Sequence, residues 1–465
     1  MGYPLEDRME AEGKAGAQSA ASLQRTEGSG AGSLLAKVLD RDNLNRAYLR
    51  VKRNKGAPGF DGMTIEELLP FLKLHGKDLI TNVALGNYKP SPVKRVEIPK
   101  PDGGIRLLGI PTVLDRMIQQ AIAQVLEPIF DPCFSESSYG FRPGRNAHQA
   151  IRKAREYYDE GNTRVVDIDL EKYFDTVNHD LLINLLREKI WDEQLLTLIR
   201  NYLKSGVMEN GIIRATETGT PQGGNLSPLL SNIYLTSFDR MLERRGHKFV
   251  RYADDSNIYV KSRRAAERVL LSCTQYLEGK LKLRVNRTKS CTGSPLKLKF
   301  LGYSLYKGQN GARIRAHGKS ITRFKSKLKQ ITRRNRGISV SAILTQLRLY
   351  VRGWLGYYSI ADMRGIMKTL SEWLRRRIRM YIWKQWKRIR TRFAQLKRLG
   401  ATEQKAWEWA NTRKGYWRIA GSWILSTTLT NERLAKLGYY DISKNYEALH
   451  LNYRTAVYGS VRTVV

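Results

Sequence analysis

Cysteine is scarce in this chain of 465 residues, which contains three cysteines. Cys133, Cys273 and Cys291 lie far apart with no CxxC pair, which excludes a disulfide framework and a zinc ribbon. Long apolar runs are also missing, since no segment approaches the roughly 18 consecutive apolar residues of a membrane span. The N-terminal region has no short apolar core behind a basic start, and its acids argue against a transit peptide. We therefore expect a cytoplasmic protein with no membrane segment.

Acidic residues are few relative to basic ones, and the imbalance is uneven along the chain. There are 81 Lys+Arg against 43 Asp+Glu, a formal charge of +38. Residues 311–465 hold 34 Lys+Arg and 7 Asp+Glu, whereas residues 1–310 hold 47 and 36. Such a charge repels itself unless a polyanion compensates it, so nucleic acid is the leading partner and an anionic membrane surface the second. The membrane alternative is poorly supported, because the C-terminal tryptophans lie among charges without a clean amphipathic stripe.

Hydrophobic periodicity predicts a body that mixes helices and strands. Residues 1–33 are rich in Gly, Ala, Ser and Glu and are expected to form a flexible tail. Apolar residues at spacings of three and four favour helices, and alternation favours strands. We predict helices over 34–54, 64–85, 115–129, 179–203 and 228–241, a hairpin over 93–110, strands over 164–170 and 249–260, and almost only helix after 318. This order indicates an α+β fold.

Two acidic segments are candidates for a metal site. In KFVRYADDSNIYV (248–260), strand-like runs flank Asp254 and Asp255, which we place at a hairpin tip. Adjacent acids repel each other there unless a divalent cation reverses the interaction, and a solvated turn is the alternative. In RVVDIDLEKYFD (164–175), alternation puts Asp167 and Asp169 on one strand face and apolar residues on the other. Enzymes that use two Mg²⁺ ions about 3.5–4 Å apart need carboxylates from separate strands, which these segments supply.

Two further segments fit a phosphate-bearing substrate. TPQGGNLSPLL (220–230) is a Gly-rich loop that opens a helix, so its backbone can approach a sugar-phosphate closely. Lys94, Lys100 and Arg106 lie on the two arms of the hairpin around PDGG, where they could close over a triphosphate. Taken singly, the loop is typical of many helix starts, and the three cations are typical of solvated hairpin charges.

Taken in order, these segments resemble a reverse transcriptase, and more closely the reverse transcriptase–maturases encoded by bacterial group II introns. The resemblance covers roughly residues 40–450. It rests on DNLNRAYLRVKRNKGAPGFDGM (42–63), YKPSPVKRVEIPKPDGGIRLLGIPT (88–112), SYGFRPGRNAHQAI (138–151), VDIDLEKYFDTVNHD (166–180), GTPQGGNLSPLLSNIYL (219–235), RYADD (251–255), VNRTKS (285–290) and FLGY (300–303).

The resemblance implies a right-hand polymerase of fingers, palm and thumb, with a helical, basic C-terminal DNA-binding region. It assigns catalysis and metal binding to Asp169, Asp254 and Asp255, whereas Asp167 is not among the family's ligands. The implied metal is a pair of Mg²⁺ ions, for which Mn²⁺ can substitute. Phe174 falls where the family keeps an aromatic ring against the sugar 2′ position. Lys289 falls where polymerases place a general acid for pyrophosphate. The implied dNTP contacts are Lys94, Lys100, Arg106, Phe174, Gln222 and Lys289.

The basic C-terminal third is predicted to bind nucleic acid. Residues 313–336 contain ten Lys+Arg and no acid, and residues 372–400 contain eleven with one Glu and several aromatic rings. Basic stems beside rings contact phosphates and stack on unpaired bases, although each Trp taken singly is more often a core residue. LYVRGWLGYYSI (349–360) resembles the maturase motif, which implies binding of the parent intron RNA, and 383–438 resembles the family's DNA-binding tail. The predicted contacts are Arg323, Lys325, Lys327, Arg352, Trp354, Arg375, Arg376, Arg377, Lys384, Lys387 and Arg388.

The expected division is a tail (1–33), fingers and palm (34–310), a thumb and maturase domain (311–375) and a DNA-binding region (376–465). The expected protein is an RNA-directed DNA polymerase that assists splicing of its intron and copies it during retrohoming. Its expected partners are the parent intron RNA, target DNA, a primer–template duplex and dNTPs, in a bacterial cytoplasm and at the nucleoid when bound to DNA.

Two alternative functions stay open. The first is a splicing-only maturase whose polymerase site has decayed, which the intact aspartates oppose. The second is a reverse transcriptase for defence or sequence diversification, which the maturase motif and the basic tail oppose. No HNH-type pattern of His and Cys follows the basic tail, so we expect priming from a pre-existing DNA end.

Overall fold

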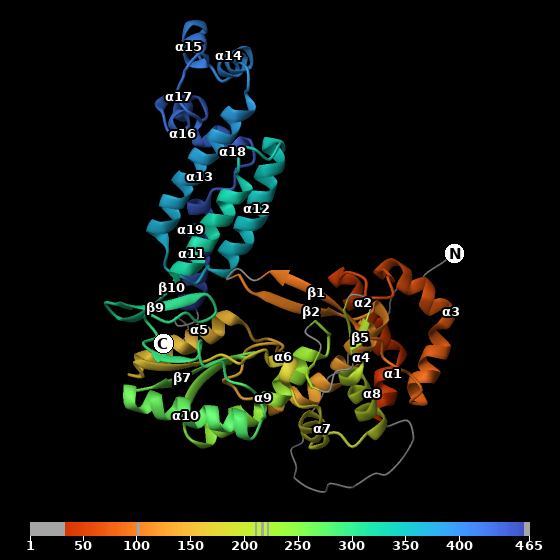
Figure 1. Ribbon diagram of the computed structural model, residues 1–465. Coiled ribbons are helices and arrows are strands. Elements are labelled where there is room, and N and C mark those ends of the chain that lie inside the picture. The colour runs from red at the N-terminus through yellow and green to blue at the C-terminus, as the bar shows by residue number, and fades with distance from the viewer. Residues whose placement is uncertain (1–32, 100–102, 210–211, 215–217, 221–222, 460–465) are drawn as a thin grey trace, which may run out of the picture.

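The computed structural model describes residues 33–99, 103–209, 212–214, 218–220 and 223–459. Helices and strands are mixed up to residue 316, and only helices follow. In Figure 1 the N-terminal helices lie to the right, a body of sheet and helices lies to the lower left, and the C-terminal helices form a column above that body. The α+β fold class predicted from the sequence is confirmed. Among the described residues, none of the helices combines the length and apolar character that crossing a bilayer requires.

The N-terminal part and the central part of the chain contain ten α-helices among their described residues. Most of these helices begin at a capping side chain. Asp40, Asn146 and Asp192 each accept a hydrogen bond from a backbone amide in the first turn of the helix that follows. The helices are α1 (Leu34–Leu39), α2 (Arg41–Asn54), α3 (Ile65–Ala84), α4 (Val113–Phe130), α5 (Ala147–Asp159), α6 (Tyr173–Thr176), α7 (His179–Arg187), α8 (Glu193–Lys204), α9 (Ser227–Arg244) and α10 (Arg263–Gly279), with a 3₁₀ turn η1 at Asp131–Cys133.

The N-terminal sheet has the strand order β2-β1-β4-β5. Its members are β1 (Val93–Pro99), β2 (Ile105–Ile110), β4 (Val207–Glu209) and β5 (Ile212–Arg214). The antiparallel β1–β2 hairpin matches the prediction from the PDGG turn. Its register sets Lys94 opposite Ile110 and Arg106 opposite Ile98, so both cations lie on one face of the hairpin.

The central sheet is antiparallel, with the strand order β6-β7-β3-β8. Its members are β3 (Arg164–Ile168), β6 (Lys248–Tyr252), β7 (Asp255–Val260) and β8 (Cys291–Gly293). Helices α5, α9 and α10 pack against these strands. Val166, Ile168 and Leu170 enter the apolar core that joins the N-terminal and central parts. The predicted two-faced character of β3 is therefore confirmed for its apolar face, whereas on the face that carries the acids Val165 is buried in a second apolar core.

The C-terminal part begins with the hairpin of β9 (Tyr303–Gly308) and β10 (Gly311–Ala316), after which only helices follow. A second apolar core joins this part to the central part, since its residues run from Tyr139 to Tyr446. The helices are α11 (Gly318–Ile331), α12 (Val340–Tyr357), α13 (Arg364–Gln385), α14 (Ile389–Arg398), α15 (Glu403–Ala410), α16 (Tyr416–Ala420), α17 (Trp423–Thr428), α18 (Asn431–Lys436) and α19 (Ile442–Gly459).

Two of the expected domain limits fall inside continuous structure. The limit at 310/311 lies in the turn between the paired strands β9 and β10, and the limit at 375/376 lies within α13. Charge density set these limits, whereas hydrogen bonds and packing do not follow charge. The division of the chain into domains stays a proposal.

Candidate active site

Asp169 lies directly after β3, on the acidic face of that strand. Its backbone N–H donates to Ser290 Oγ at 3.0 Å, and its carbonyl oxygen accepts from the Asn286 N–H at 2.9 Å. A β-bridge between Leu170 and Val285 continues this contact. The segment 285–290 therefore fixes the backbone of Asp169 from the side away from β7.

Asp254 lies in the tight turn between β6 and β7. Tyr252 pairs with Asp255 across the hairpin, so Ala253 and Asp254 form a two-residue loop. The prediction of both acids at the tip is corrected, because Asp255 is the first residue of β7. β7 also pairs with β3, Ser256 opposite Ile168. Extending that register by one residue sets Asp255 opposite Asp169.

The acids on this edge of the central sheet destabilise one another as anions. Burial raises the pKa of Asp255 to about 6, with further contributions from Asp254 and Asp169. Burial, followed by Asp169, also raises the pKa of Asp254, while Arg106 of β2 acts in the opposite direction. Asp167 is half-buried two residues before Asp169 on the same strand, and burial, Asp255 and Asp169 raise its pKa to about 7. A divalent cation among these carboxylates would relieve the repulsion.

The donor set suits a hard divalent cation, although the protein alone does not form a closed cage. No group of three His, Cys, Asp or Glu side chains among the described residues is arranged to hold a metal ion. Mg²⁺ at nucleotide-processing sites uses one or two carboxylates together with substrate phosphates and water, rather than an all-protein cage. Asp169, Asp254 and Asp255 therefore fit a site that the substrate completes.

The Gly-rich loop is anchored to the segment that carries Phe174. The Thr220 N–H donates to the Phe174 carbonyl oxygen at 2.6 Å, and the Gly219 N–H donates to the Val177 carbonyl oxygen at 2.8 Å. Gly219 has a φ of 99°, and a Cβ there would lie 2.8 Å from the Phe174 carbonyl oxygen. Phe174 is half-buried, and its ring lies edge-on to Tyr173. Gln222 lies outside the described residues.

Cations face the acidic edge from two directions. Arg106 on β2 is exposed and lowers the pKa of Asp254, so it approaches the acidic turn from the N-terminal sheet. Lys289 Nζ lies 4.0 Å from Asp169 Oδ1. Lys94 is exposed on the same hairpin face as Arg106. Arg106 pairs with Ile98, which lies four residues after Lys94, so the two cations are about 13 Å apart along the strand direction. Lys100 lies outside the described residues.

Comparison with known proteins identifies the family. Residues 98–305 match the family described as "Reverse transcriptase (RNA-dependent DNA polymerase)", and residues 321–400 match "Group II intron, maturase-specific domain". Protein YkfC of Escherichia coli is 37% identical over 297 residues, which cover 55% of this chain and 78% of YkfC. The chain belongs to the group II intron-type reverse transcriptases. As reverse transcriptases, these are RNA-directed DNA polymerases that depend on divalent metal.

Other relatives are longer than the region they share with this reverse transcriptase. The group II intron-encoded protein LtrA of Lactococcus lactis is 39% identical over 206 residues, which are 44% of this chain and 34% of LtrA. The putative COX1/OXI3 intron 2 protein of Saccharomyces cerevisiae is 35% identical over 216 residues, 46% of this chain and 25% of that protein. The chain therefore spans about a third or less of these intron-encoded relatives.

Most of the expected nucleic-acid contacts of the reverse transcriptase lie on the surface of its helical column. Arg375 pairs with Asp441 at 3.0 Å, and Arg376 lies over the Trp417 ring at 4.1 Å. Lys384 is half-buried beside Tyr416. The exposed residues of this set are Arg323, Lys325, Lys327, Arg352, Lys387 and Arg388.

Two of the expected contacts pack inside the column. Arg377 is 9% exposed and donates to Thr332 Oγ1 at 2.6 Å and to the Lys329 carbonyl oxygen at 3.1 Å. Its expected role on nucleic acid is corrected, because the guanidinium satisfies the end of α11. Trp354 is half-buried and stacks on Phe324 with a centroid distance of 4.0 Å.

Sequence reasoning missed the contact that joins α12 to the central part. The Tyr357 carbonyl oxygen is 2.6 Å from His148 Nε2 and also accepts from the Tyr303 hydroxyl. The Tyr357 hydroxyl donates to the Leu301 carbonyl oxygen at 2.8 Å. The FLGY and RGWLGYY motifs therefore meet, a pairing that their separate resemblances gave no reason to expect.

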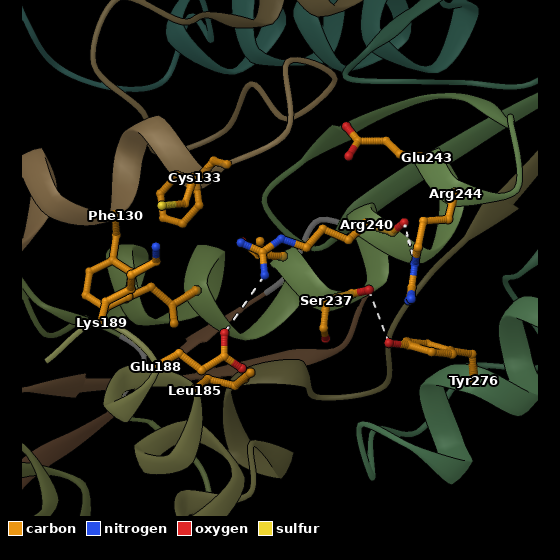
Figure 2. Close-up of a pocket in the computed structure, with 13 residues that line it drawn as sticks. Phe130, Cys133, Leu185, Glu188, Lys189, Ser237, Arg240, Glu243, Arg244 and Tyr276 are labelled. Atoms are coloured by element: carbon orange, nitrogen blue, oxygen red, sulfur yellow. Dashed lines mark hydrogen bonds and ion pairs between the residues drawn. The ribbon is translucent and has the colours of Figure 1, made fainter. Parts of the chain in front are cut away.

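A cavity of about 450 Å³ lies elsewhere, along α9, between Phe130, Arg240 and Tyr276 (Figure 2). Arg240 faces Glu188 across it at 3.9 Å. None of the predicted site residues lines this cavity.

Proposed function

We propose that Asp169, Asp254 and Asp255 are the metal ligands and catalytic residues of an RNA-directed DNA polymerase that copies its parent intron RNA into cDNA. The observation that carries this is the meeting of acids from two separate strands opposite a cation of the N-terminal hairpin. The strand register sets Asp255 of β7 opposite Asp169, and Asp254 lies in the turn directly before Asp255. The effects on the pKa of Asp254, which Asp169 raises and Arg106 lowers, agree with this arrangement.

The proposed roles of the surrounding residues come from the family resemblance. Arg106 and Lys94 bind the triphosphate from the face of the β1–β2 hairpin, together with Lys100. Phe174, whose carbonyl oxygen accepts from the Thr220 N–H, would exclude a ribose 2′-hydroxyl with its ring. Lys289, next to Asp169, would donate a proton to the leaving pyrophosphate.

The proposed cofactor is a pair of Mg²⁺ ions, for which Mn²⁺ can substitute. When bound, the ions lower the pKa of the primer 3′-hydroxyl and neutralise charge on the triphosphate. The protein needs no covalent nucleophile, since phosphoryl transfer of this kind depends on positioning and electrostatics. The carboxylates and the facing cations supply both.

We further propose that the exposed cations of the helical column bind the parent intron RNA and target DNA. The relatives named as intron-encoded proteins and the maturase-specific match over 321–400 support this partner. Arg323, Lys325 and Lys327 lie exposed on α11, and Arg352 lies exposed on α12. With RNA held there, the protein would assist splicing and begin retrohoming.

The test is primer extension on an RNA template with dNTPs and Mg²⁺, comparing the wild type with Asp254→Asn. The matched control is Asp180→Asn, an exposed acid that pairs with Arg200 on the surface. We expect cDNA from the wild type and from the control, and none from Asp254→Asn. RNA binding and stimulated splicing by a wild type that makes no cDNA would instead establish the splicing-only maturase.

A further inference from the structure

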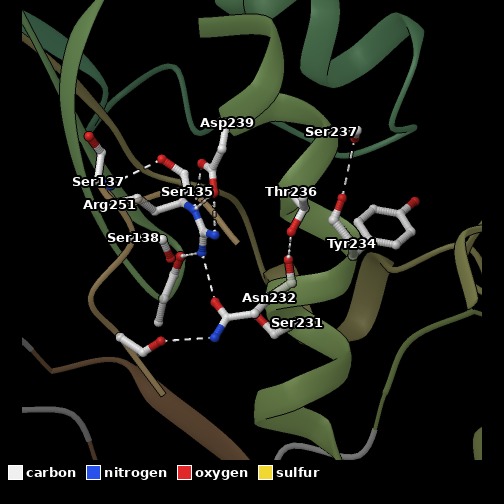
Figure 3. A network of polar contacts seen from close by, with 12 residues as sticks. Ser135, Ser137, Ser138, Ser231, Asn232, Tyr234, Thr236, Ser237, Asp239 and Arg251 are labelled. Carbon is white, nitrogen blue, oxygen red and sulfur yellow. Dashed lines mark hydrogen bonds and ion pairs between the residues drawn. The ribbon is translucent and has the colours of Figure 1, made fainter. Parts of the chain in front are cut away.

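The acidic turn rests on a buried charged network (Figure 3). Arg251 of β6 and Asp239 and Asn232 of α9 are each 0% exposed. Arg251 donates to both carboxylate oxygens of Asp239, at 2.8 Å from Nε to Oδ1 and 2.5 Å from Nη2 to Oδ2. Its Nη1 donates to Asn232 Oδ1 and to the Ala253 carbonyl oxygen, both at 2.9 Å. Arg251 thus ties the residue before Asp254 to helix α9.

A neighbouring loop holds the same turn from its other side. The Arg251 N–H donates to the Ser137 carbonyl oxygen, and the Tyr139 N–H donates to the Arg251 carbonyl oxygen, both at 2.9 Å. Asn232 Nδ2 donates to the Gly140 carbonyl oxygen at 2.9 Å. Loop 137–140, strand β6 and helix α9 are therefore joined through Arg251 and Asn232.

The turn needs this support because its backbone conformation is unfavourable. Ala253 has a φ of 58°, in the left-handed region that residues other than glycine rarely adopt. Such conformations persist only where the surrounding structure enforces them, and they cluster at functional sites. The donor that reaches the Ala253 carbonyl oxygen is a rigid, planar guanidinium, which a lysine cannot imitate.

Net stability is a weak explanation for the pair. Desolvation offsets most of the attraction within a buried ion pair, and apolar residues of similar volume often replace such a pair without loss. Apolar replacements, however, would not fix the direction of the turn. α9 also begins at Ser227, directly after the Gly-rich loop, so one helix connects the proposed nucleotide loop with the acidic turn.

We propose that Arg251 is a positioning residue, which through Asp239 and Asn232 fixes the Asp254 carboxylate in the geometry that metal binding and nucleotidyl transfer require. The proposal rests on the proposed function for its catalytic part. Its structural part, the order of the turn, is measurable without any activity.

The test compares Arg251→Lys, which keeps the buried charge, with the double variant Arg251→Met/Asp239→Leu, which removes both charges. Arg187→Lys is the matched control, because Arg187 forms a two-bond pair with Glu193 on the exposed surface. Each protein is followed by thermal unfolding, by hydrogen exchange of peptides covering 137–141 and 251–256, by Mn²⁺ binding with electron paramagnetic resonance, and by single-nucleotide incorporation.

We expect both Arg251 variants to fold, with at least tenfold faster exchange in the two peptides and at least tenfold weaker Mn²⁺ binding. Their kcat should fall about 100-fold while KM for the dNTP changes less than threefold, because positioning errors act on the transition state. Wild-type exchange, Mn²⁺ binding and kcat in the double variant would overturn the proposal. If the wild type itself incorporates nothing, the proposed function fails, whereas the exchange and Mn²⁺ measurements still decide the role of Arg251.

Discussion

Gly140 offers a steric test of how tightly the acidic turn must be placed. A Cβ at this position would lie 2.3 Å from the Ala253 nitrogen and 2.9 Å from the Tyr252 carbonyl carbon. Ordinary contact begins at 3.4 Å, so Gly140→Ala must displace the turn, or its own loop, by about 1 Å. A misplacement of about 1 Å costs roughly 100-fold in rate, or about 2.7 kcal/mol of activation free energy.

The assay for Gly140→Ala is single-turnover incorporation of one dNTP, with thermal unfolding measured on the same preparations. Gly76→Ala is the control, because Gly76 lies within α3 and a Cβ there meets nothing within 4 Å. The control should gain about 0.8–1 kcal/mol of stability from helix propensity and keep its rate. A folded Gly140→Ala protein that incorporates dNTP at the wild-type rate would refute the reasoning.

Three further substitutions separate structural roles from substrate contacts. Arg377→Ala should lower the free energy of unfolding by about 3 kcal/mol, since it leaves buried acceptors unpaired, and chemical denaturation measures this loss. Lys387→Ala should lower only the affinity for nucleic acid, together with the slope of that affinity against salt concentration by about 0.9, as filter binding would show. The reverse pattern would contradict both assignments. Phe174→Val should reduce the preference for dNTPs over ribonucleotides at least tenfold in competitive incorporation, and an unchanged preference would remove Phe174 from the sugar site. Tyr357→Phe loses the hydrogen bond to the Leu301 carbonyl oxygen, which is worth about 1 kcal/mol. In extension assays with a trap that prevents rebinding, its cDNA products should be shorter than those of the wild type. Full-length products would argue against a role for this contact.

Features that depend on neighbouring residues could be predicted from the sequence. Alternation placed Val166 and Ile168 in the core and the acids of the same strand on the opposite face, as the structure has them. The PDGG turn gave the β1–β2 hairpin, because turn and strand signals lie within a few residues of each other. The roles of Asp169 and the dNTP contacts came from the family resemblance, and they stay proposals.

Features that depend on distant partners could not be predicted. A run of arginines indicates a solvated or phosphate-binding face. Nothing in the sequence therefore marked Arg377 as the donor to a carbonyl oxygen at the end of α11. Arg251 likewise precedes a conspicuous acidic motif, and its partners on α9 lie 12 and 19 positions earlier in the chain. A charged residue amid positions predicted to be buried, such as Asp239 between Phe238 and Met241, is the available signal for such networks.

The most direct test of the central claim is the Mg²⁺ dependence of single-nucleotide incorporation on an RNA template, measured for the wild type and Asp169→Asn. We expect the wild-type rate to rise with Mg²⁺ and to vanish in EDTA. For Asp169→Asn we expect a maximal rate at least 1,000-fold lower, with unchanged affinity for the primer–template duplex. Incorporation at the wild-type rate by Asp169→Asn, or by the wild type in EDTA, would contradict it.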